Sequence, residues 1–128
     1  MTLSTFIQNY KQTLTDEISN LNAQSEQLKI ENRDDEYNFN RVENNIVEIF
    51  DQMFEISLKK IKDESNWKTE LTTSYLSFFN KIPTAWHTNL EKCKVHGLED
   101  EIFIETLKIN KAETIKTMFL TMIEEEKI

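Results

Sequence analysis

The chain contains a single glycine and a single proline among its 128 residues. Turns and strand edges normally use both, because glycine adopts backbone conformations that other residues avoid and proline fixes one backbone angle of a turn. A chain so poor in both has few corners, and we predict long helices joined by short links. The same scarcity argues against loops that bind phosphates or dinucleotides, because such loops need several glycines at fixed spacing.

Apolar residues recur at steps of three and four along almost the whole chain, which is the spacing of one helix face. We therefore predict four helices, at about residues 5–31, 35–62, 66–96 and 99–125. Similar helix lengths and short connections favour an all-α fold, an antiparallel bundle of four long helices in a single domain over residues 1–128. A chain of this length can bury one core without help from disulfides or metals.

Sequence signals mark several helix ends. Thr5 followed by Gln8 has the spacing of a capping box at the start of the first helix. Gly97 would close the third helix in a left-handed conformation, which makes Leu98 and Cys93 the pair that meets in a Schellman motif. No glycine or proline interrupts residues 31–36, so the sequence leaves open whether the first two helices form one continuous rod.

Pro83 lies in the middle of the third predicted helix. Proline lacks a backbone N–H and its ring clashes with the preceding turn, so we predict a kink or a break at this position. Asn80 would cap a restarted helix, which would place Pro83 in a first turn where proline is tolerated. Both alternatives remain open at this stage.

Charge and hydropathy limit the classes of partner. The net charge of −8 argues against a nucleic-acid partner, because neutralising phosphates requires a stripe of lysine and arginine. No apolar run approaches the roughly 20 residues that span a bilayer, so we expect no membrane partner. The first residues lack the features of a signal peptide and the single cysteine, Cys93, suits a reducing compartment, so we expect a cytoplasmic protein.

Candidate chemistry is sparse. His87, Glu91, Cys93 and His96 lie within ten residues, but Cys93 and His96 lie on a different side of the helix from the His87–Glu91 pair. The spacing of a zinc protease motif is absent, and no third group would orient His96 as a base for the Cys93 thiol. We therefore predict no bound metal, no cofactor and no enzymatic activity.

The first helix carries a narrow apolar stripe of coiled-coil width, flanked by Asn, Gln and Ser. Such a stripe suits a helix seated in a groove or paired across a dimer axis. We therefore predict a protein-interaction or self-associating module, and we expect a homodimer. Its partner-binding residues would be those of the stripe, Leu3, Ile7, Tyr10, Leu14 and Leu21.

Two other functions stay open. Aromatic residues around Pro83 would line an apolar pocket of a regulatory domain that binds a small ligand, if a kinked helix opened a gap in the bundle. The residues of that pocket would be Trp67, Tyr75, Phe79 and Trp86. The third function is inhibition of a nucleic-acid enzyme by acidic mimicry, which the clusters at residues 34–36, 99–101 and 124–126 suggest.

Overall fold

The computed structural model of the protein describes residues 2–125. The four helices agree with the predicted ranges to within three residues at each end, and no strand occurs in the described part of the chain. This result confirms the predicted all-α bundle. The elements are α1 (Leu3–Ile30), α2 (Asp34–Lys59), a 3-10 turn η1 (Glu64–Asn66), α3 (Trp67–His96) and α4 (Glu99–Glu125).

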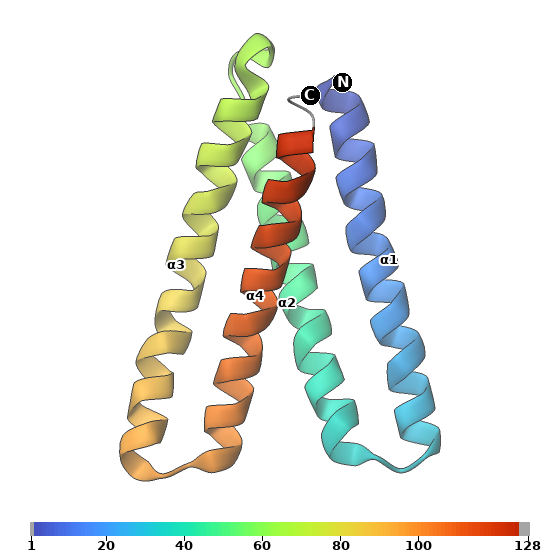
Figure 1. Cartoon of the computed structure of the whole chain (residues 1–128), viewed down its shortest axis with the longest axis vertical. Coiled ribbons are helices and arrows are strands. Elements are labelled where there is room, and N and C mark those ends of the chain that lie inside the picture. Colours follow the sequence, from blue (N-terminus) through green and yellow to red (C-terminus); the bar gives the residue numbers. More distant parts are fainter. Residues whose placement is uncertain (1, 126–128) are drawn as a thin grey trace.

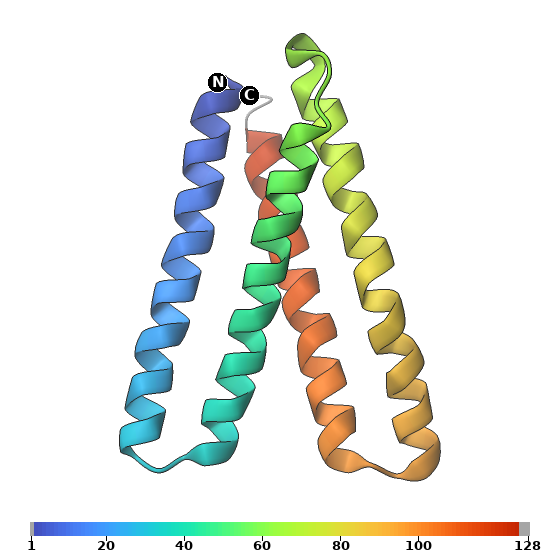
Figure 2. The same ribbon diagram turned by 180° about the vertical axis from the view of Figure 1, so that it is seen from behind.

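The helices form two antiparallel hairpins, α1 with α2 and α3 with α4 (Figure 1). All four helices come together where α1 begins and α4 ends, and we call this region the joined end. The hairpins move apart toward the links at residues 31–33 and 97–98, and we call this region the splayed end (Figure 2). None of the described helices combines the length and the apolar character needed to cross a membrane.

An aromatic core holds the joined end together. Phe6 of α1 is fully buried and its ring lies 5.4 Å from that of Trp67 and 5.9 Å from that of Phe119. The ring of Phe54 in α2 is 6.5 Å away, so Phe6 contacts a ring from each of the other three helices. Aromatic side chains bury large apolar areas and pair favourably at tilted or edge-on angles. The two hairpins are therefore fastened most firmly at this end.

The contact between hairpins continues along α2 and α4 toward the splayed end. There the rings of Phe39 in α2 and Phe103 in α4 lie 4.5 Å apart. Phe103 keeps 50% of its surface exposed, although phenylalanine is one of the residues most often buried. The seam between the hairpins thus ends in a ring pair that is partly open to solvent.

The start of α1 differs from the predicted capping box. Thr2 is the N-cap, and its Oγ1 accepts a hydrogen bond from the Thr5 backbone N–H at 3.2 Å. The predicted box at Thr5 and Gln8 was wrong, because the helix begins two residues earlier and Thr5 already lies in its first turn. The Thr2 side chain satisfies one of the four N–H groups that a helix start leaves without partners.

Gly97 closes α3 as predicted. The φ of Gly97 is +66°. The Gly97 N–H donates to the Lys94 carbonyl at 3.3 Å, and the Leu98 N–H donates to the Cys93 carbonyl at 3.0 Å. These two bonds define a Schellman motif, with a left-handed residue just past the helix. The chain therefore reverses within two residues and starts α4 at Glu99.

Asn32 makes the equivalent turn between α1 and α2. It has a φ of +58°, and its N–H donates to the Lys29 carbonyl at 3.2 Å. The N–H of Arg33 donates to the Leu28 carbonyl at 2.9 Å, which completes a second Schellman motif. Asparagine tolerates the left-handed conformation better than other residues with a Cβ. The first two helices are therefore separate, and the continuous rod is not formed.

The third helix runs through Pro83 without a break. Asn80 lies inside α3, where its carbonyl accepts a hydrogen bond from Thr84 Oγ1 at 2.9 Å, so the restart capped by Asn80 does not occur. Pro83 itself is buried. Pro83 has no N–H to donate to the Phe79 carbonyl four residues before it, and the helix continues through this position without that bond.

Candidate functional site

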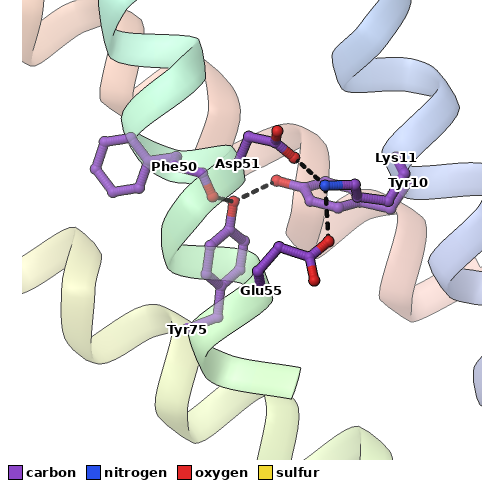
Figure 3. Close-up of polar contacts among 6 residues, drawn as sticks. All are labelled: Tyr10, Lys11, Phe50, Asp51, Glu55 and Tyr75. Carbon is purple, nitrogen blue, oxygen red and sulfur yellow. Dashed lines mark hydrogen bonds and ion pairs between the residues drawn. The ribbon is translucent and has the colours of Figure 1, made fainter. Parts of the chain in front are cut away.

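A buried tyrosine pair links three helices (Figure 3). The hydroxyl oxygens of Tyr10 in α1 and Tyr75 in α3 lie 2.7 Å apart, and Tyr75 donates to the Phe50 carbonyl of α2 at 2.9 Å. Because the Tyr75 hydroxyl has only one hydrogen, Tyr10 must be the donor between the two phenols. A directed chain of hydrogen bonds therefore runs from α1 through α3 to α2.

The surroundings of this pair suit structure better than catalysis. Both tyrosines are 0% exposed, and burial raises the pKa of Tyr10 and of Tyr75 far above the ordinary phenol value. Each phenol therefore stays protonated at neutral pH, and its oxygen has no access to solvent. The pair fixes the positions of the three helices relative to one another.

Lys11 forms an ion-pair cluster next to the tyrosines, between α1 and α2 (Figure 3). Its Nζ lies 2.5 Å from Asp51 Oδ1 and 2.8 Å from Glu55 Oε1. Partial burial alone would lower the pKa of Lys11, but the hydrogen bonds to the two carboxylates outweigh that effect and raise it. The ammonium group is therefore charged at neutral pH, and the cluster links α1 to α2.

A second cluster connects the two hairpins. Lys111 of α4 places its Nζ 2.6 Å from Glu17 of α1 and 3.5 Å from Glu43 of α2. Only 11% of the Lys111 side chain is exposed, so water screens these attractions less than it screens surface pairs. The lysine thus holds α4 against both helices of the other hairpin.

Glu105 is an unexpected buried carboxylate on α4, with 6% of its surface exposed. Its Oε1 accepts a hydrogen bond from Lys108 at 2.9 Å, and its buried Oε2 has no partner among the described residues.

Burial raises the pKa of the nearby Cys93 thiol, and the carboxylates of Glu101 and Glu105 raise it further. Cys93 is therefore a protonated thiol at neutral pH, which is the unreactive form.

The four residues of the third helix that were considered as metal ligands do not come together. In the part of the chain that the structure describes, no group of three or more His, Cys, Asp or Glu side chains could hold a metal ion. His87, Glu91 and His96 are exposed, whereas Cys93 is buried. The four residues therefore share a stretch of sequence and not a site.

The predicted partner-binding stripe of the first helix packs largely within its own chain. Tyr10, Leu14 and Leu21 are 0%, 1% and 5% exposed, and Leu3 and Ile7 are half-buried. α2 runs antiparallel to α1 (Figure 2), and the ring of Tyr10 packs against rings of α2, α3 and α4. Most of the stripe therefore belongs to the core of its own chain.

The predicted pocket residues also lie in packed surroundings. Tyr75 and Phe79 contact each other at a ring distance of 4.9 Å, and Phe79 stacks on Phe50 at 4.1 Å. Trp67 belongs to the aromatic core at the joined end, while Trp86 is half-buried, with Lys108 Nζ 5.9 Å from its ring centre. The structure brings Tyr75 and Phe79 together but spreads the four residues over about 28 Å of helix.

The splayed end carries most of the exposed apolar side chains. Exposed large apolar residues number five in the described chain, and four of them lie near the two links at this end. The fifth, Ile56, lies on α2 nearer the joined end. The four are Ile30 (73% exposed), Val95 (81%), Leu98 (45%) and Phe103 (50%).

Two acidic helix starts lie at the same end. The first turn of α2 contains Asp34, Asp35 and Glu36, and the first turn of α4 contains residues 99–101, all acidic. Among these six carboxylates only Glu36 makes an ion pair in the described chain, with Arg33 at 2.6 Å. An open hollow of about 360 Å³ lies beside the second acidic turn and includes Leu98 in its lining. Apolar and negatively charged side chains are therefore neighbours at the α3–α4 link.

Comparison of the chain with protein-family models, with curated proteins and with solved structures finds no match.

Proposed function

We propose that the protein is a non-enzymatic protein-interaction module and that its contact surface is the splayed end. The supporting observation is that four of the five exposed large apolar side chains lie there. Single apolar residues on a surface are ordinary, but their concentration at one end of a molecule is typical of a surface that a partner covers.

The rest of the molecule supports this location. The joined end uses its aromatic rings to fasten the two hairpins, and the stripe of α1 already packs against the core of its own chain. Lys11 and Lys111 each form ion pairs with two carboxylates of neighbouring helices. These features stabilise the fold and leave the splayed end as the region with unused binding groups.

Self-association through the same surface is a second form of this function. A symmetric dimer formed by two splayed ends would bring the acidic first turns of both copies together. Like charges across an interface oppose binding, which makes a different protein the favoured partner.

Affinity capture from the source cells, together with sedimentation equilibrium of the pure protein, tests the proposal. Phe103→Ser should abolish capture of the specific partner, or dissociate the dimer if one forms. Ile56→Ser is the matched control, because Ile56 is also exposed but lies away from the splayed end. Unchanged capture and an unchanged oligomeric state in Phe103→Ser would contradict the proposal.

A further inference from the structure

We infer that the α3–α4 side of the splayed end binds a basic amphipathic helix of a partner protein. This inference rests on the proposed function and adds the chemistry of the partner. It combines two observations about one place, namely exposed apolar side chains and carboxylates that have no ion-pair partner.

The apolar part consists of Leu98 at the link and Phe103 one turn into α4. Leu98 lines the hollow beside the first turn of α4 and is 45% exposed. Phe103 is half exposed while its ring contacts Phe39, so the end of the seam between the hairpins is open to solvent. A helix laid across this end would bury both side chains with its own apolar face, as in other helix-in-groove contacts.

The charged part of the surface determines the charge that a partner must carry at the contact. Residues 99–101 are acidic, line the same hollow as Leu98 and make no ion pair in the described chain. The positive end of the α4 dipole offsets only about half an elementary charge. Lys94 at the end of α3 is already paired with Glu91, at 3.4 Å. The local field therefore attracts lysine and arginine side chains at the rim of an apolar contact.

The same field disfavours other occupants. A nucleic acid or an anionic bilayer would bring negative charge to a negative surface, and a second copy would present the same acidic turn. The occupant that satisfies both parts of the surface has an apolar stripe flanked by basic residues.

A fluorescent peptide of leucine and lysine at helical spacing is the probe, and fluorescence anisotropy measures its binding. A peptide with glutamate in place of every lysine is the charge control. We expect the basic peptide to bind the wild-type protein and the acidic peptide not to bind. Because apolar anchors dominate such contacts, Phe103→Ser should weaken binding roughly tenfold, and Ile56→Ser should leave it unchanged.

Charge variants test the second part of the surface. The double variant Glu99→Gln, Asp100→Asn should weaken binding roughly tenfold at low salt, and the loss should shrink as ionic strength rises. The matched control is Glu48→Gln, Glu113→Gln, which removes two exposed carboxylates away from the splayed end. Circular dichroism melts verify that each variant is folded at the assay temperature.

The outcomes separate this inference from the proposed function. Equal binding of the two peptides, or equal losses in the splayed-end variants and their controls, would overturn the inference. If the basic peptide does not bind but Phe103→Ser still dissociates a dimer or abolishes capture of a partner, the inference fails and the proposed function stands. If neither the peptide nor any partner responds to Phe103→Ser, both fail.

Discussion

The hydrogen-bond chain through Tyr10 and Tyr75 predicts that two chemically identical substitutions have unequal effects. Tyr10→Phe removes the first donor of the chain, and Tyr75 keeps its bond to the Phe50 carbonyl. We expect a loss of about 1 kcal/mol in the free energy of unfolding, the typical net value of one hydrogen bond.

Tyr75→Phe should cost more, because it removes two bonds and leaves the buried Tyr10 hydroxyl without an acceptor. The lost bond to the Phe50 carbonyl costs about 1 kcal/mol, and leaving the buried Tyr10 donor without a partner costs about 1 to 3 kcal/mol, so we expect a total near 2 to 4 kcal/mol. The double variant should cost about 2 kcal/mol, less than the sum of the single effects, because it leaves no phenol unpaired.

Urea unfolding followed by circular dichroism measures all three values. In thermal melts each kcal/mol corresponds to about 4 °C for a chain of this size. The reasoning is refuted if Tyr10→Phe costs as much as Tyr75→Phe, or if the two losses simply add. Either result would mean that the two phenols do not form the directed chain shown in Figure 3.

Three further predictions concern the links, the ion pairs and alkaline pH. Gly97→Val should destabilise the protein by about 1 to 2 kcal/mol in urea unfolding, because valine is strained at a positive φ although a Cβ there meets no other atom. Lys111→Met should lower the free energy of unfolding by about 1 to 2 kcal/mol, because it leaves the carboxylates of Glu17 and Glu43 without their shared cation, and this loss should be smaller at high salt. Lys116→Met is the control, on the same helix but without an ion pair, and should have little effect on the free energy of unfolding. The raised pKa values of Tyr10 and Tyr75 give stability that is complete below pH 10 and is lost above it, so absorbance at alkaline pH should show both phenols ionising together with unfolding.

Each of these three results has an outcome that would contradict it. If Gly97→Val were as stable as the wild-type protein, the α3–α4 link would not need a left-handed residue at position 97. Equal losses in the two lysine variants would mean that the Lys111 pairs contribute nothing. Reversible ionisation of all the tyrosines in the folded protein would mean that the pair is accessible to solvent.

The sequence predicted the features that depend on local structure. The number and extent of the helices follow from periodicity, and the role of Gly97 follows from the left-handed turn that a short link requires. Asn32 gave a usable signal that the sequence reasoning missed, because asparagine is the residue that most often replaces glycine just past a helix. The predicted cap at Thr5 failed by a small shift, since Thr2 offers the same hydroxyl closer to the chain start.

The features that depend on how helices rotate against one another were not predicted. The fourth helix has apolar residues on all sides, so its own pattern does not determine which of them face the core. Phe103 consequently lies half exposed and Glu105 lies buried, the reverse of the expectation from their residue types. The pairing of Tyr10 with Tyr75 joins residues 65 positions apart and follows from the packing of the whole bundle.

The candidate surface was missed for the same reason. The sequence places three acidic clusters and several apolar residues along the chain, but only the fold brings two of those clusters to one end, beside Leu98 and Phe103. The narrow stripe of the first helix looked free, because the chain alone does not show that the stripe packs into the common core of the bundle.

The most direct test of the account is a two-dimensional ¹H–¹⁵N spectrum of the labelled protein, recorded during titration with the leucine–lysine peptide. We predict that the shifted amide signals belong mainly to residues 95–103 and to the part of α2 around Phe39, whose ring contacts Phe103, while the aromatic core at the joined end is unaffected. Shifts centred on the joined end or on the outer face of α1, or no shifts at all, would contradict the assignment of the splayed end as the surface that binds a partner.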